Sequence, residues 1–497
     1  MPADVSTESP GYKSALEKWR LPMALMGGTR AIRKNQAEWL PKYPGEDSND
    51  WDLRVQNTTL TNVYKKTVHR LSSTPFAKPI SFDADVDDRI DGIDGVGGWS
   101  RNVDRSGTDV STFARDLLVD LLVFGKCHIY VDYPPTGEEI LSEGEVERLD
   151  LRPYMKRISP RDLFAWDVTT QNGSEVINEL RWKEKVVERT GAFEETEHEQ
   201  IRVVRKNEIQ IWRKAKGAVG STGERWLLVE QFPVIMPVEE GEQRIPFVTI
   251  YANKQAPMVS YPPLEDLADL NLKHVRIDSD LQRILHVNCV PFLLATGFSP
   301  KELEDTTIAP NTIVEASSSA AEMKFVEHSG ASIALIQTSL DKVQEDMERM
   351  SLEMISKSGT GDITATEKAI NTAEQTSELQ EIVRNMESGL TKAFQVMLMW
   401  VGEPDVEDVP IGVDIASDFG LVFRSETDLQ LLIQMFIADG ITHETFLHEA
   451  KCRGLLNEAL DVKKEAAATK KEKEDMAPPI APPVNPPVPV DDPSQAA

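Results

Sequence analysis

The stretch "PPLEDLADLNLKHVRIDSDLQRILHV", residues 262–287, predicts one long helix. Pro262 and Pro263 stand at its start, where proline is favourable because the amide that it lacks would be unpaired there anyway. At the rise of an α-helix, residues 264–287 would extend ~36 Å.

A second long helix is expected at residues 331–355. Pro291 and a mixed strand and turn pattern interrupt the helical spacing over residues 288–330, which predicts a compact insertion. Beyond it, apolar residues recur every three or four positions, as on an amphipathic helix. They are Ile333, Ile336, Leu340, Val343, Met347, Met350 and Met354.

The stretch "SKSGTGDITATEK", residues 356–368, separates this helix from a third. Gly359 and Gly361 give the connection backbone freedom that other residues lack. Thr364 and Glu367 form a capping-box pattern, and no proline interrupts the run to Trp400. An unbroken helix over residues 364–400 would extend ~55 Å.

The region before residue 262 is predicted to begin with helices. Residues 12–40 have helical spacing with a break at Gly27 and Gly28, and residues 51–73 are expected to form one helix. The buried face of that helix would hold Leu53, Leu60, Val63, Tyr64, Val68 and Leu71. In "DVSTFARDLLVDLLVFGKCHIYVDYP", Asp109 or Ser111 caps a helix, and Gly125 ends it before a strand.

Residues 152–250 alternate apolar and polar side chains, which predicts an antiparallel sheet closed by "IPFVTIYAN". The fold class is therefore α+β. Residues 403–460 add a strand, "GLVFRSE", and two helices. Residues 461–497 are first charged and then proline-rich, so they are expected to be extended and mobile.

Composition restricts the classes of function. The chain has 497 residues, which suits two or more units or one elongated subunit. Its net charge of -28 opposes a generic DNA-binding or lipid-binding role. The three cysteines, Cys127, Cys289 and Cys452, lack paired spacing, so no disulfide framework or cysteine zinc site is expected. We expect a soluble protein that is made in the cytoplasm, because no signal peptide pattern or membrane span is evident.

Few residues suggest catalysis, and no catalytic residue, metal ligand or cofactor is predicted. "HETFLH" places His443 and His448 five residues apart, too far for a one-turn zinc pair. Methionines 347, 350 and 354 suit core packing better than an adaptable binding face. Carboxylates of "FDADVDD" suit a hard cation, although a solvated acidic loop is the simpler interpretation. They are Asp83, Asp85, Asp87 and Asp88.

The order of several segments resembles the portal proteins of tailed bacteriophages, in a branch that carries a domain of unknown function. "WDLRVQNTTLTNVYKKTVHRLSSTPFAKP" looks like the opening helix and its G-x-x-F-x-K-P ending, with Ser72 or Ser73 in place of the glycine. "FARDLLVDLLVFGKCHIYVDYP" and "GDITATEKAINTAEQTSELQEIVRNMESGLTKAF" are similar to later segments, and the resemblance covers residues 12–460. Its weight lies in the order of the segments.

The resemblance implies a virion protein that forms a ring, a dodecamer in that family, at one capsid vertex. Double-stranded DNA would pass through the axis, and the packaging terminase, tail adaptors, and major capsid and scaffolding proteins would be partners. By position, 1–263 would form the wing, 264–287 and 331–355 the stem helices, 288–330 an α/β clip, 364–402 a long wing helix and 403–460 the crown.

The same resemblance places a tunnel loop at residues 356–363, facing the DNA. Lys357 would touch phosphates transiently, while the acidic ring would discourage tight binding. The loop residues are Ser356, Lys357, Ser358, Gly359, Thr360, Gly361, Asp362 and Ile363.

Two alternatives stay open at this point. One is another soluble scaffold or adaptor of phage assembly, which an open axial channel would distinguish from a portal. The other is a metal-dependent nuclease that uses the "FDADVDD" carboxylates, which a cleavage assay with magnesium would reveal.

Overall fold

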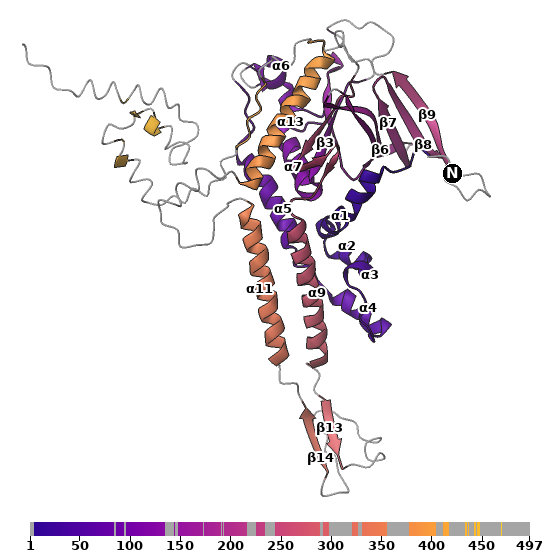
Figure 1. The fold of residues 1–497 in the computed structure, drawn as a ribbon, viewed down its shortest axis with the longest axis vertical. Helices are drawn as coiled ribbons and strands as arrows, with labels where there is room; N and C mark the ends of the chain where they lie inside the picture. Colours follow the sequence, from indigo (N-terminus) through magenta and orange to yellow (C-terminus); the bar gives the residue numbers. More distant parts are fainter. Residues whose placement is uncertain are drawn as a thin grey trace, which may run out of the picture. The chain divides into compact units, whose positions relative to one another are not determined.

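The structure, a computed structural model, places most of the first 416 residues and few of the later ones. The described residues are 4–83, 86–93, 96–134, 144, 148–171, 173–189, 191, 193–215, 225–233, 244–288, 292–297, 321–326, 331–354, 377–403, 411–416, 433–434, 436, 442–443, 445–447 and 469. The chain divides into two units, Met1–Phe419 and Gly420–Ala497, and the named helices and strands all lie in the first. Helices and antiparallel sheets are combined, as the α+β prediction requires (Figure 1).

The first helices follow the predicted break. α1 (Pro10–Gly27) is capped by Ser9, whose side chain accepts from the Tyr12 amide, and α2 (Thr29–Lys34) and α3 (Gln36–Trp39) come next. Gly28 joins α1 to α2 with a φ of 73°, a value that glycine adopts without strain. Trp19 of α1 is fully buried and donates its indole N–H to the carbonyl of Phe124.

The prediction of one helix over residues 51–73 is wrong. The structure has two, α4 (Ser48–Asn57) and α5 (Val63–Ser73). The Asn62 side chain accepts the Lys65 N–H and so starts α5 afresh, which spacing alone does not reveal. Leu53, expected on the buried face, is 54% exposed.

The helix α7 (Val110–Phe124) and the strand after it agree with the sequence. Asp109 caps the helix and Gly125 ends it in the left-handed conformation. The next strand, β3 (Lys126–Asp132), lies between β10 (Phe247–Tyr251) and β4 (Tyr154–Ile158) in a three-stranded antiparallel sheet.

Five further strands form a second antiparallel sheet in chain order. They are β5 (Leu163–Gln171), β6 (Ser174–Arg189), β7 (Glu195–Arg205), β8 (Glu208–Ala215) and β9 (Arg225–Pro233). The expectation of a single sheet closed by "IPFVTIYAN" is therefore corrected, because β10 pairs with β3. Buried side chains from both sheets pack together, with the rings of Tyr130 and Trp182 5.3 Å apart.

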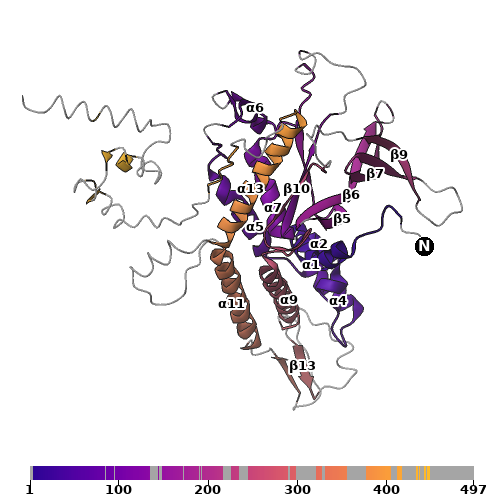
Figure 2. The same ribbon diagram turned by 45° about the horizontal axis from the view of Figure 1, so that its top comes forward.

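The long helices complete the first unit. They are α9 (Glu265–Asn288), α11 (Ala331–Glu353) and α13 (Glu378–Trp400). α13 packs against β10, where Gly389 lies on Ile250 (Figures 1 and 2). Within the described residues, none of the helices combines the length and the hydropathy that crossing a bilayer requires.

Short elements fill the connections. They are η1 (Thr74–Ala77), α6 (Asp88–Asp91), β1 (Gly92–Ile93), β2 (Val96–Gly97), η2 (Trp99–Arg101), β11 (Lys254–Ala256), β12 (Val259–Ser260), β13 (Phe292–Thr296) and β14 (Glu322–Val326).

Candidate functional site

The candidate site is the pair of helices α9 and α11, together with the segments that precede, join and follow them. α9 begins two residues after the predicted prolines, and its first turn carries Glu265 and Asp266, which complement the positive end of the helix dipole. Its 24 residues correspond to ~36 Å, as predicted. Leu267, Ala268 and Val275 are buried, so α9 contributes to the hydrophobic core of the first unit.

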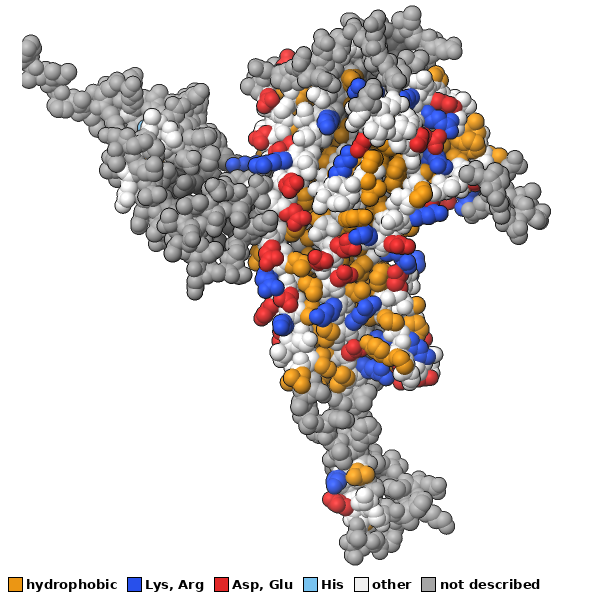
Figure 3. Space-filling model, in the orientation of Figure 1, with side chains coloured by type: hydrophobic (Ala, Val, Ile, Leu, Met, Phe, Trp, Pro, Cys, Tyr) orange, Lys and Arg blue, Asp and Glu red, His pale blue; other side chains and the backbone are white. Residues whose placement is uncertain are grey.

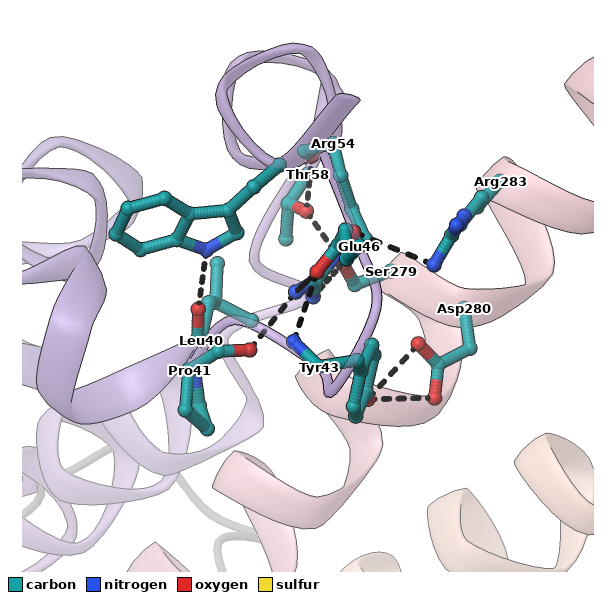
Figure 4. A network of polar contacts seen from close by, with 10 residues as sticks. Leu40, Pro41, Tyr43, Glu46, Arg54, Thr58, Ser279, Asp280 and Arg283 are labelled. Carbon is teal, nitrogen blue, oxygen red and sulfur yellow. Dashed lines mark hydrogen bonds and ion pairs between the residues drawn. The ribbon is translucent and has the colours of Figure 1, made fainter. Parts of the chain in front are cut away.

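The N-terminal segment holds one side of α9 through a buried polar network (Figure 4). Arg54 of α4 pairs with Glu46 at 2.8 Å, and both side chains are almost fully buried. Arg54 also contacts Ser279 of α9 at 3.3 Å, and Arg283 lies 3.3 Å from the Glu46 carboxylate. The hydrogen bonds from Arg54, above all, hold the pKa of Glu46 below its usual range. This network fixes α4 to α9 through charge-assisted bonds.

The other side of α9 packs against α11. Val343, Met347 and Met354 are buried there, which confirms core packing as the role of two of the three methionines in the stripe. Ser351 anchors α11 to α5, because its hydroxyl lies 3.0 Å from the Thr67 hydroxyl and accepts from Arg70 at 2.8 Å.

A small hairpin joins the two helices along the chain. β13 and β14 pair antiparallel from Phe292 opposite Val326 to Thr296 opposite Glu322. The strand character predicted within residues 288–330 is present in these ten positions, and residues 298–320 lie outside the described part.

The chain leaves α11 and returns to α13 at one point. The Leu379 amide donates to the Met354 carbonyl at 3.3 Å. The two residues that flank the intervening segment are therefore in contact. The predicted tunnel loop, Ser356 to Ile363, lies outside the described residues.

The prediction of one unbroken helix over residues 364–400 is wrong. Residue 377 has extended φ and ψ values, and its side chain caps α13 in a capping box with Gln380. The third helix therefore starts at Glu378 and measures ~34 Å over 23 residues. Thr364 and Glu367, the capping pair predicted instead, lie outside the described residues.

Two of the four aspartates suggested as cation ligands, Asp83 and Asp87, form other contacts. Asp87 caps α6 and pairs with Arg89 at 2.6 Å, and Asp85 lies outside the described residues. The Asp83 amide donates to the Gly412 carbonyl. Where the structure describes the chain, no three His, Cys, Asp or Glu side chains gather as a metal site would need. His443 is described and His448 is not.

Comparisons with known proteins give one family and several solved structures. The family described as "Domain of unknown function (DUF4055)" matches residues 263–401, from the start of α9 to just after α13. No curated protein matches the chain.

Several of the similar solved structures are of gene transfer agent (GTA) particles. The chain is similar to one from the "Neck of empty GTA particle computed with C6 symmetry", with 10% identity, a TM-score of 0.39, and coverage of 79% of this chain and 89% of that chain. It is similar to one from the "Virion of native gene transfer agent (GTA) particle", with 11% identity, a TM-score of 0.40, and coverage of 76% and 86%.

Proposed function

We propose that the protein is a portal subunit, and that copies of it form a ring at one capsid vertex through which double-stranded DNA passes during packaging and ejection. In this proposal the role is structural rather than catalytic. A terminase and tail adaptors would dock on the ring, and capsid and scaffolding proteins would surround it.

The observation that carries the proposal is the arrangement of α9, β13, β14, α11 and α13. Two packed helices carry a hairpin between them, and the chain then makes an excursion whose ends, at Met354 and Leu379, meet at a hydrogen bond. The resemblance drawn from the sequence implies this order for the stem, clip, tunnel loop and wing helix.

The net charge of -28 suits such a conduit. Phosphates bound tightly along a channel would stop the DNA, whereas an acidic wall repels it weakly at any distance that salt does not screen. The charge that opposes a DNA-binding protein is therefore compatible with a protein that passes DNA.

The proposed loop gives a direct test of the conduit. Replacing Gly359 and Gly361 by proline should leave ring assembly intact and impair DNA packaging, because proline restricts the backbone without changing the charge. A packaging assay with preassembled rings measures this. Lys357→Glu should have a milder effect that salt reduces, as expected for one transient phosphate contact.

Alanine replacements of Gly359 and Gly361 are the matched control, because they add a side chain with less restriction of φ. Normal packaging by the proline variant would show that movement of the loop is not needed for DNA passage.

A further inference from the structure

Two oppositely charged faces lie in the first unit. α11 exposes Asp341, Glu345 and Glu348, whose spacing of three and four residues puts them on one helix face. α2 exposes Arg30 and Lys34, which are one turn apart. We name these the acidic face and the basic face.

The side chains of both faces are free of ion pairs in the part of the chain that the structure describes. Glu348 only accepts a hydrogen bond from Gln344, at 3.2 Å. Other charged side chains of the first unit do form ion pairs, such as Arg20 with Glu38 at 2.6 Å. The two faces thus present unmatched charge of opposite sign.

The faces lie on opposite sides of α9. α11, α1 and α4 all pack against α9. Figures 1 and 2 both show α11 and the α2–α4 segment separated by α9.

Hydrogen bonds connect α9 to the segments beside the two faces. Arg276 donates to the carbonyl of Trp39, shortly after α2, at 2.9 Å. Asn271 accepts from Tyr64 of α5, the helix whose Thr67 contacts Ser351 of α11. These bonds connect the segment that follows α2, and through α5 also α11, to the first half of α9.

Two large apolar side chains outside these faces are also exposed. Leu335 of α11 is 74% exposed and Leu53 of α4 is 54% exposed. Figure 3 shows hydrophobic side chains among the charged ones over the long helices.

We propose that the acidic face of one copy docks against the basic face of a second copy, with Glu345 and Glu348 opposite Arg30 and Lys34. This rests on the proposed function, which requires a ring. The two faces differ, so the contact is head-to-tail and can repeat around a closed ring. Complementary charges would fix the register of neighbours and disfavour wrong pairings.

A charge exchange between copies tests the pairing. E345K/E348K gives a chain with two basic faces, and R30E/K34E gives a chain with two acidic faces. Each alone should need about tenfold more protein for half-assembly, as expected when like charges meet across an interface. A one-to-one mixture should assemble again, because every contact then joins opposite charges. Native mass measurement of the full chain reports the assembly.

Matched controls lie on the hairpin of β6 and β7. E195K/E197K and K183E/K185E change the net charge by the same amounts at exposed positions away from α9. They should assemble like the unchanged chain.

The outcomes separate this proposal from the ring itself. Normal assembly by either single-sign variant overturns the pairing while the ring remains. Variants that fail alone and also fail when mixed overturn it too, because their charges then meet a different partner. Absence of rings from the unchanged chain would instead contradict the proposed function.

Discussion

Replacing Glu46 by alanine is expected to destabilise the association of α4 with α9 by ~3–5 kcal/mol, the cost of leaving one charge of a buried pair without its partner. The Glu46 carboxylate accepts two hydrogen bonds from Arg54, at 2.8 and 3.0 Å, and both side chains are buried. Hydrogen exchange of peptides spanning α4 should show the loss of protection most directly, together with a lower unfolding midpoint.

The exposed pair Arg20 with Glu38 is the matched control. Its side chains are 55% and 31% exposed, so E38A should cost ~0–1 kcal/mol. Equal effects of E46A and E38A would show that the buried network does not hold α4.

The pKa of Glu46 adds a pH dependence. Because the folded pKa lies below the unfolded value of ~4.3, the carboxylate stabilises the fold above that pH. The contribution is lost as the pH falls through the folded pKa. E46A should therefore weaken the acid sensitivity of α4 protection.

The second large effect is expected at Gly125. Its φ of 78° is left-handed, which costs an alanine ~1–2 kcal/mol. A Cβ there would also overlap the Tyr261 carbonyl, and the Gly125 carbonyl accepts from Ser260 at 2.6 Å and Ala252 at 2.8 Å. G125A should cost ~3 kcal/mol in all, because rigid backbone adds ~1–3 kcal/mol of overpacking.

Gly107 separates the two causes. It has a φ of 90° with open space around the Cβ position, so G107A should cost only the backbone part. Denaturant unfolding of both variants measures the difference. If G125A lowered the free energy of unfolding no more than G107A does, the close contact between Gly125 and Tyr261 would not contribute to stability.

Local signals in the sequence predicted several elements well. Asp109 and Gly125 mark both ends of α7, and Gly28 marks the end of α1. Pro262 and Pro263 mark the start of α9 within two residues. Caps, glycines and prolines act within one helical turn, so they can be read without knowing the fold.

The sequence does not predict features that depend on distant residues. β3 pairs with β10, more than a hundred residues later, and alternation in one strand does not name its partner. The break between α4 and α5 depends partly on Asn271, whose side chain accepts from the Tyr64 amide and donates to the Thr61 carbonyl. Nothing within residues 51–73 indicates that contact.

The sequence predicts some parts of the candidate site and not others. The prolines before α9 and the apolar spacing of α11, which includes the buried Met347, predict these two helices. The capping-box pattern at Thr364 predicts a start for the third helix that differs from the observed start at Glu378. Ser377 followed by Gln380 is a capping-box pattern as well, of the form S-x-x-Q, and it marks the observed start. The pair of Glu46 and Arg54 gave no usable signal, because an acid and a base eight residues apart are common.

The most direct test of the account is electron microscopy of the purified full-length protein. We expect closed rings viewed end-on with an open axial channel, and side views in which the paired helices α9 and α11 run along that axis. A field of 55.5 kDa monomers at high protein concentration, or closed particles without a channel, would contradict the portal proposal.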